Sequence, residues 1–300
     1  MRFSFGICAY NEEENIGELF SNLSNHKTAH ALEKIIVVAS GCTDRTVEIA
    51  EKQASRDSRI LLIAEDKRVG KYSAVNRIFT ENSSEVLVMI DADCLLADGA
   101  VDQLIRSLEA EKVGAVCGRT VPLNKEFDGF WGYVSHLRYK IFDESALRAA
   151  KNKSFCHISG YLYAIKGGLA KEIKLPPIIQ DDLYVGLETA RRGYLVDFMP
   201  SALVNIMHPT KFSPFIKQRK RIRLGHMQIE KMTGVRAYST VPAAMAPIVL
   251  KVMRKDPLGA FYTLAVAILE QYAAFLAYLD LRKGKIKPDW DYIETSKKLK

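Results

Sequence analysis

Hydrophobic and polar positions alternate in blocks along the first 120 residues, and each block has the period of a strand or a helix. Short apolar runs predict strands at residues 3–8, 35–38, 60–64, 86–90 and 113–117. Apolar residues spaced three and four apart predict the buried faces of two helices: Ile16, Leu19, Phe20 and Leu23, then Val101, Leu104, Ile105 and Leu108. Strands and helices in this alternating order predict an α/β fold with a mostly parallel central sheet flanked by helices.

The middle of the chain has a less regular pattern. Apolar spacing predicts helices at residues 127–150, 183–192 and 212–232. Strands are predicted at residues 155–165, 194–198 and 202–207. No internal repeat or low-complexity linker is visible between these segments. We therefore expect residues 1–232 to form one domain.

The C-terminal region, residues 233–300, combines apolar stretches at 241–252 and 258–281 with a basic tail. The second stretch is long enough to span a bilayer. Glu270 near its centre would cost about 2.5–3.5 kcal/mol inside the membrane. A single span would also place the basic tail outside, against the positive-inside tendency. We expect amphipathic or apolar helices that lie in the membrane interface or pack on the domain.

Composition narrows the class of protein. The chain has 300 residues, of which 48% are hydrophobic and 26% charged, and this excludes disorder, collagen and a polytopic membrane protein. The net charge of +8 fits anionic partners such as nucleotides, phosphates, a membrane surface or nucleic acid. Five scattered cysteines without a CxxC pair indicate a reducing compartment. The N-terminus lacks the features of a signal peptide, so we expect a cytoplasmic catalytic part.

Polar clusters directly follow three of the predicted strands. They are Tyr10-Asn11-Glu12, the segment from Ser40 to Asp44, and Asp91-Ala92-Asp93. Ligands bind beyond the carboxyl ends of the strands in such sheets, so the three clusters predict a single site. Asp91 and Asp93 can both reach one hard cation, and Mg²⁺ or Mn²⁺ accepts such carboxylate oxygens. A solvated turn with two acids is the alternative.

Further candidates lie outside these strand ends. Asp181 and Asp182 open a helix, where acids also occur as simple capping residues, and one of them could act as a general base. The basic segment from Gln218 to Arg223 could stabilise a phosphate, contact lipid headgroups or form a solvated helix face. Arg221 lies in this segment. Each candidate therefore has a structural and a functional interpretation.

A basic loop before the helix that starts near residue 71 could meet a phosphate through its backbone. Gly70 and Lys71 belong to this loop, and Asn76 follows in the helix. The loop lacks the GxxxxGK[ST] pattern of a P-loop, and no GxGxxG follows the first strand. His208 follows a strand and precedes a proline, so it is either a structural histidine or a metal ligand.

Taken together, the motifs resemble those of the family-2 inverting glycosyltransferases, whose fold is the GT-A nucleotide-sugar fold. The resemblance covers about three quarters of the chain, from Phe3 to Gly225. Each motif is weak alone, but their order and spacing are specific. The matching segments are AYNEE at 9–13, VVASGCTDRT at 37–46, GKYSAVN at 70–76, DAD at 91–93, GR at 118–119, SG at 159–160, DDL at 181–183 and QRKR at 218–221.

The resemblance implies roles for individual residues. A donor nucleotide and its diphosphate would contact Ala9, Tyr10, Glu12, Ser40, Asp44, Gly70, Lys71, Asn76, Asp91, Gln218 and Arg221. Asp91 and Asp93, and on our residue-based prediction His208, would hold Mn²⁺ or Mg²⁺. Asp182 would be the catalytic base, next to Asp181 in place of the usual glutamate. Residues 1–120 would form the nucleotide-binding half and residues 121–232 the acceptor and catalytic half.

Three departures from the family pattern limit what it implies. Ala39 stands where an acid often contacts the nucleotide, and Cys8 replaces a frequent proline. Ile222 replaces the tryptophan of the QxxRW motif of processive synthases, which predicts transfer of one sugar per encounter.

The sequence as a whole predicts a metal-dependent inverting glycosyltransferase that uses a nucleotide-diphosphate sugar. Its acceptor would be a glycan or a lipid-linked hydroxyl compound, and its location cytoplasmic, peripheral on the inner face of the cell membrane. A non-catalytic nucleotide-binding or membrane adaptor and a sugar nucleotidyltransferase are the alternatives. Nucleic acid is not an expected partner, because no basic-aromatic motif accompanies the positive charge.

Overall fold

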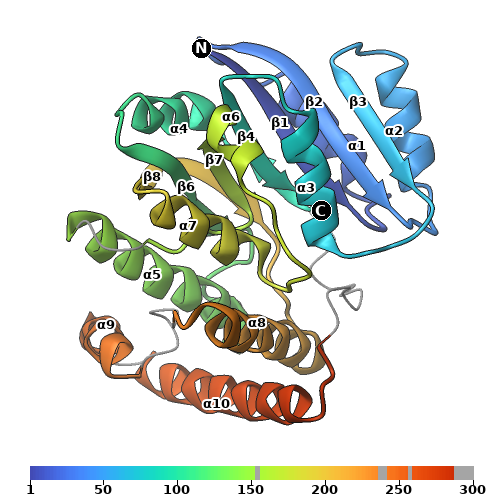
Figure 1. Cartoon of the computed structure of the whole chain (residues 1–300). Coiled ribbons are helices and arrows are strands. Elements are labelled where there is room, and N and C mark those ends of the chain that lie inside the picture. Colours follow the sequence, from blue (N-terminus) through green and yellow to red (C-terminus); the bar gives the residue numbers. More distant parts are fainter. Residues whose placement is uncertain (153–155, 236–241, 256–258, 287–300) are drawn as a thin grey trace.

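A mixed eight-stranded sheet forms the centre of the protein, in the order β3-β2-β1-β4-β7-β6-β8-β5 (Figure 1). The computed structural model describes residues 1–152, 156–235, 242–255 and 259–286. The strands are β1 (Arg2–Ala9), β2 (Ala31–Ser40), β3 (Ile60–Glu65), β4 (Val86–Asp91), β5 (Cys94–Leu96), β6 (Val113–Pro122), β7 (Leu162–Lys166) and β8 (Leu195–Ile206). Strands β1 to β4 pair in parallel, as does β6 with β8. The other pairings, β4–β7, β6–β7 and β5–β8, are antiparallel.

The helices cover the sheet and extend beyond it. They are α1 (Ile16–Ser24), α2 (Thr46–Ala54), α3 (Lys71–Glu81), α4 (Ala100–Leu108), α5 (Gly129–Lys151), α6 (Gly167–Glu172), α7 (Asp181–Arg191), α8 (Phe212–Thr233), α9 (Pro242–Lys255) and α10 (Ala260–Arg282). The apolar faces predicted for α1 and α4 are fully buried in the core. These elements confirm the predicted α/β class.

Three predicted strands differ from those in the structure. The strand expected at 155–165 is confined to β7, and residues 158–161 before it line a cavity. Residue 155 lies outside the described part. The strands expected at 194–198 and 202–207 are one strand, β8. Pro200 and Ser201 interrupt its apolar alternation where its register with β6 shifts.

The C-terminal helices pack on the domain. Figure 1 shows α10 beneath α8, with α5 and α9 nearby, and contacts join α10 to all three. Val134 and Leu137 of α5, Phe215 of α8, and Val266 and Ala273 of α10 belong to one buried cluster. Within the described residues, α10 is the one helix long and apolar enough to cross a membrane by length and composition. The basic residues from 287 onward lie outside the described part.

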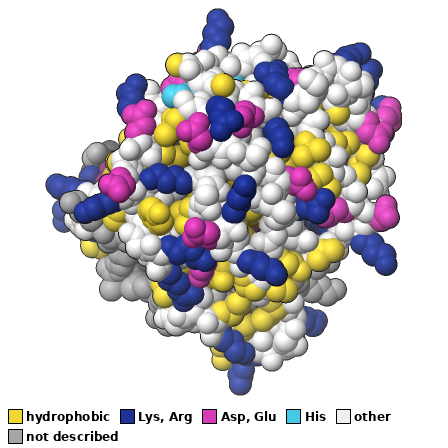
Figure 2. Space-filling view, turned by 45° about the horizontal axis from the view of Figure 1, so that its top comes forward, with side chains coloured by type: hydrophobic (Ala, Val, Ile, Leu, Met, Phe, Trp, Pro, Cys, Tyr) yellow, Lys and Arg dark blue, Asp and Glu magenta, His cyan; other side chains and the backbone are white. Residues whose placement is uncertain are grey.

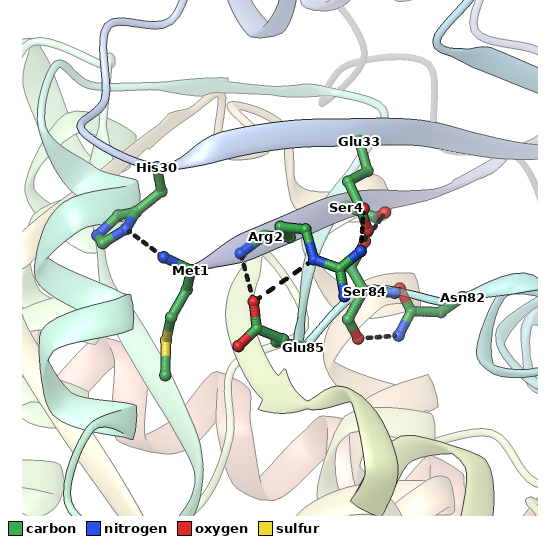
Figure 3. Close-up of polar contacts among 8 residues, drawn as sticks. All are labelled: Met1, Arg2, Ser4, His30, Glu33, Asn82, Ser84 and Glu85. Carbon is green, nitrogen blue, oxygen red and sulfur yellow. Dashed lines mark hydrogen bonds and ion pairs between the residues drawn. The ribbon is translucent and has the colours of Figure 1, made fainter.

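The amino ends of β1 and β4 are joined by a polar network (Figure 3). The Arg2 guanidinium donates to Glu33, and the Arg2 backbone N–H donates to Glu85 at 2.8 Å. The hydroxyls of Ser4 and Ser84 are 2.7 Å apart and buried. This network closes the edge of the sheet opposite to the carboxyl ends of the strands.

Candidate active site

A cavity of about 780 Å³ opens at the carboxyl ends of β1, β2 and β4 and extends between α5, α8 and α10. The structure brings twelve of the predicted site residues to its wall: Ala9, Tyr10, Glu12, Ser40, Gly70, Lys71, Asp91, Asp93, Asp181, Asp182, Gln218 and Arg221. Asp93 and Asp182, which are far apart in the sequence, therefore share one cavity. The parallel strands explain this, because their carboxyl ends meet at the same sheet edge.

Lys71 connects the two acidic segments of the site. Its Nζ lies 2.6 Å from Asp91 Oδ1 and 3.5 Å from Asp181 Oδ2, and its side chain is only 14% exposed. Gly70 precedes it with φ of +126°, a backbone conformation that favours glycine and starts α3 at the cavity wall. Burial disfavours the lysine charge, but Asp181 and Asp91 outweigh it and hold the Lys71 pKa well above its usual value.

Burial and mutual repulsion also raise the pKa values of carboxyl groups in the site. Burial, followed by the charge of Asp91, raises the pKa of Asp93 to about 7. Burial, followed by the charge of Asp181, raises the pKa of Asp182 to about 7. Burial also lowers the pKa of Arg221 to about 9, although Asp181, Asp182 and Asp91 favour its charged form. Carboxyl groups that titrate near neutral pH in a cavity are typical of functional sites.

Asp182 is held in position by backbone donors. Its Oδ2 accepts a hydrogen bond from Gly160 N–H at 2.9 Å, and its Oδ1 accepts one from Leu183 N–H at 2.7 Å. A Cβ on Gly160 would lie 3.1 Å from Asp182 Oδ2, so glycine permits this close approach. Gly160 stood in the family-like segment at 159–160, but its contact with Asp182 is visible only in the structure.

An aromatic ring and a guanidinium stack at the β1 end of the cavity. Arg68 lies over the Tyr10 ring, 3.6 Å from its centroid. Gly41, with φ of +61°, lies directly beside the Arg68 backbone, where a Cβ would come within 2.6 Å of its nitrogen. Ser40 donates to the Glu65 carboxylate. Arg68 belongs to the basic loop that the sequence predicts to meet a phosphate or a base, and it lines the cavity.

Three predicted site residues do not line the cavity: Asp44, Asn76 and His208. Asp44 accepts from the backbone N–H groups of Thr46 and Glu13, at the start of α2. Asn76 exchanges two 2.8 Å hydrogen bonds with the backbone of Leu175. Both side chains therefore have structural partners within the protein, and their contact with a nucleotide stays a prediction.

His208 has protein partners on both ring nitrogens. Arg138 lies 2.7 Å from its Nε2, and the Pro209 carbonyl lies 3.1 Å from its Nδ1. Burial, aided by the charge of Arg138, lowers the His208 pKa well below its usual value. Metal ligation by His208, as predicted, would require the ion to replace Arg138.

Comparison with known proteins identifies the family. Residues 4–170 match glycosyl transferase family 2. The chain belongs to this family. The GT-A glycosyltransferase resemblance drawn from the motifs is thereby confirmed.

The chain is similar to glycosyltransferases in both sequence and structure. The chain is 25% identical over 234 residues to poly-β-1,6-N-acetyl-D-glucosamine synthase of Staphylococcus aureus (strain COL), which covers 75% of this chain and 55% of the synthase. It thus spans about half the length of that relative. Glycosyltransferase AglE of Haloferax volcanii is 22% identical, covering 74% of this chain and 72% of AglE.

Solved structures share the fold. A mannosyltransferase from Pyrobaculum calidifontis, in complex with GDP-Man and Mn²⁺, aligns with a TM-score of 0.67 at 19% identity, covering 94% of this chain and 87% of that one. TarS of S. aureus aligns with a TM-score of 0.51 at 14% identity, covering 77% of this chain and 40% of that one. At these sequence identities, the structural similarity shows a shared fold alone.

Proposed function

We propose that this family-2 glycosyltransferase transfers one sugar from a nucleotide-diphosphate sugar to an acceptor hydroxyl with inversion at the anomeric carbon. The observation that carries the proposal is the placement of Asp91, Asp93 and Asp182 around one cavity, with Arg221 on the same wall. Ile222, in place of the tryptophan of processive synthases, supports one transfer per encounter.

The residues present fit a divalent cation. Asp91 and Asp93 offer carboxylate oxygens, the donors that Mg²⁺ and Mn²⁺ prefer. Among the described residues no group of three or more His, Cys, Asp or Glu side chains is placed to hold a metal alone, so the ion would share diphosphate oxygens of the donor. When bound there, it would neutralise the diphosphate and improve it as a leaving group. The Mn²⁺ in the Pyrobaculum mannosyltransferase structure supports this choice of ion.

Asp182 is the proposed general base. Its raised pKa of about 7 suits proton removal from an acceptor hydroxyl near neutral pH, and two backbone N–H groups hold its oxygens in place. Asp181 lies within 3.5 Å of Lys71 Nζ, which makes it the less suitable proton acceptor. Arg221, on the same wall, would stabilise the negative charge of the departing diphosphate.

The proposed organisation divides the cavity between donor and acceptor. Residues 1–120 supply the wall near Tyr10 and Asp91, where the nucleotide would bind, and residues 121–232 supply the base and the acceptor side.

We place residues 233–300 at a membrane surface, because α10 exposes an outer face of large apolar side chains: Phe261, Leu264, Ile268, Tyr272, Phe275 and Tyr278. Figure 2 shows hydrophobic side chains gathered in a band across the lower part of the face that it presents. A lipid-linked acceptor on the cytoplasmic face of the membrane fits this arrangement.

A thermal-shift panel of UDP-, GDP- and CDP-sugars, with and without Mn²⁺, tests the proposal. Ligand at a hundred times its Kd stabilises the folded state by about 2.7 kcal/mol, so a cognate donor should raise the Tm by several degrees. Asp93→Asn should remove the Mn²⁺-dependent part of the shift, whereas Asp66→Asn, on an exposed loop outside the cavity, should retain it. The absence of any shift with every donor would contradict the proposal.

A further inference from the structure

A second charged group of side chains lines the cavity at the end away from the strands. Arg219 Nε and Arg223 Nη2 of α8 lie 2.5 Å and 3.0 Å from the Glu270 carboxylate of α10. Arg138 Nε of α5 lies 3.9 Å from the same carboxylate. The four side chains are between 11% and 17% exposed, and all four line the cavity. We call Arg138, Arg219, Arg223 and Glu270 the arginine cluster.

The cations of the arginine cluster outnumber the carboxylate that binds them. Burial alone would raise the Glu270 pKa, but Arg219, Arg138 and Arg223 together hold it at about 2, so the carboxylate is ionised. Burial lowers the pKa of Arg138 and of Arg223, because it disfavours their charged forms. Poorly solvated positive charge at a cavity wall is costly unless an anion accompanies it. The cluster is thus suited to a ligand with about two negative charges.

Two histidines beside the arginine cluster have ring nitrogens without a hydrogen-bond partner in the described part of the chain. His226 is 6% exposed, lines the cavity, and neither of its ring nitrogens has a hydrogen-bond partner among the described residues. The Nε2 of His157, which also lines the cavity, has none there either. The two rings lie 5.6 Å apart. Buried polar atoms are normally hydrogen-bonded, so these nitrogens indicate a ligand with polar atoms.

Part of the wall at this end is apolar. Ile141 and Phe142 of α5 and Val266, Ala267 and Ala274 of α10 face the same cavity. The opposite face of α10 carries the exposed apolar side chains of the proposed membrane surface. An acceptor that combines an acidic head with a hydrocarbon chain matches both parts of this wall.

We propose that the arginine cluster, with His157 and His226, is a binding subsite for the phosphate of a lipid-phosphate acceptor. The inference rests on the proposed function, because it assigns the acceptor end of the same cavity. A phosphate monoester carries about −1.5 to −2 charge at pH 7, which corresponds to the excess of two cations in the cluster. One guanidinium group can donate two parallel hydrogen bonds to two oxygens of the same phosphate. This geometry favours phosphate over a neutral headgroup.

Calorimetric titration of the full chain with decyl phosphate, below its micelle concentration, tests the subsite. Decyl β-glucoside has the same chain with a neutral head, and inorganic phosphate has the head without the chain. We expect decyl phosphate to bind at least about tenfold more tightly than either probe. Arg223→Gln should weaken decyl phosphate binding about tenfold or more. Lys220→Gln, on the same helix but paired with Asp280 outside the cavity, should leave it unchanged.

A variant that removes the negative charge of the cluster distinguishes an electrostatic effect on binding from damage to the fold. Glu270→Gln removes the carboxylate that competes for the guanidinium groups, so decyl phosphate should bind at least as tightly as to the wild type. A structural role of the cluster alone would weaken binding in both Glu270→Gln and Arg223→Gln. Circular dichroism of both variants checks that they are folded. Should one of them not fold, the other is compared with the wild type.

Several results would overturn the subsite. Equal binding of decyl glucoside would indicate an apolar cavity, and equal binding of inorganic phosphate would indicate a free-anion site. Arginine-dependent binding of glucuronate in place of decyl phosphate would indicate an acidic glycan. Donor binding is measured on the same proteins: if nucleotide sugars bind and decyl phosphate does not, the subsite fails and the proposed function stands. If decyl phosphate binds and no nucleotide sugar does, the proposed function fails, and the cluster binds a lipid phosphate without serving as an acceptor subsite.

Discussion

Replacement of Lys71 by methionine tests how the acidic site is held together. Lys71 Nζ is the cation that lies 2.6 Å from Asp91 and 3.5 Å from Asp181. Lys71→Met keeps most of the apolar stem of the side chain and removes its charge. The carboxylates then lose a buried partner while they remain close to one another.

The expected loss of stability depends on pH. Removing one partner of a buried ion pair costs about 3–5 kcal/mol when the other stays charged. The Asp91 pKa is already raised by burial, and Lys71 opposes that shift, so in Lys71→Met it should rise further. A carboxyl whose pKa is higher folded than unfolded binds a proton preferentially in the folded state, so stability increases as the pH falls. We therefore expect the loss to be largest at pH 8 and to shrink toward pH 5, by at most about 1.4 kcal/mol per pH unit for each carboxyl.

Urea unfolding at pH 5, 6.5 and 8 measures this dependence. Lys67→Met, on the exposed part of the same loop, is the matched control and should change stability by less than about 0.5 kcal/mol. A loss of equal size at pH 5 and pH 8, or one no larger than in the control, would refute the role given to Lys71.

Three further predictions concern the same structure. Because burial raises the Asp182 pKa to about 7 and the base must be ionised, kcat should rise with pH and level off above about pH 7; a flat pH–rate profile from 5 to 9 would argue against it. EDTA should stop turnover and Mn²⁺ should restore it. A rate that changes with neither EDTA nor Mn²⁺ would contradict metal binding by Asp91 and Asp93. Ser4→Ala, at the opposite edge of the sheet, should cost about 1 kcal/mol of unfolding free energy with turnover unchanged; a fall in kcat would show unexpected coupling to the site.

Local periodicity predicted the elements that carry a strong pattern. The faces of α1 and α4 were evident from three- and four-residue spacing, and all the predicted positions are buried. The strand β5 has only three residues and pairs with the distant β8, so no local pattern marks it. The antiparallel position of β7 between β4 and β6 likewise depends on tertiary packing.

The part of the candidate site that directly follows strand ends was predictable from the sequence. It was less predictable where a polar side chain could bind either a ligand or a nearby backbone group. Asp91 and Asp93 follow β4, so the sheet places them at the cavity wall. Asp44 and Asn76 are polar residues in suitable loops and helices, but their hydrogen bonds go to nearby backbone. Glu270 was read from the sequence as a cost to membrane insertion, and only the packing of α10 on α8 shows that arginines bind it.

The central claim is that Asp182 removes the acceptor proton in a cavity that binds the donor independently of it. Turnover of Asp182→Asn at saturating donor with Mn²⁺, measured together with the donor Kd, tests it most directly. The account predicts a fall in kcat of about 10²–10⁴-fold with a donor Kd near that of the wild type. Wild-type turnover at saturation combined with a collapse of donor affinity would contradict it.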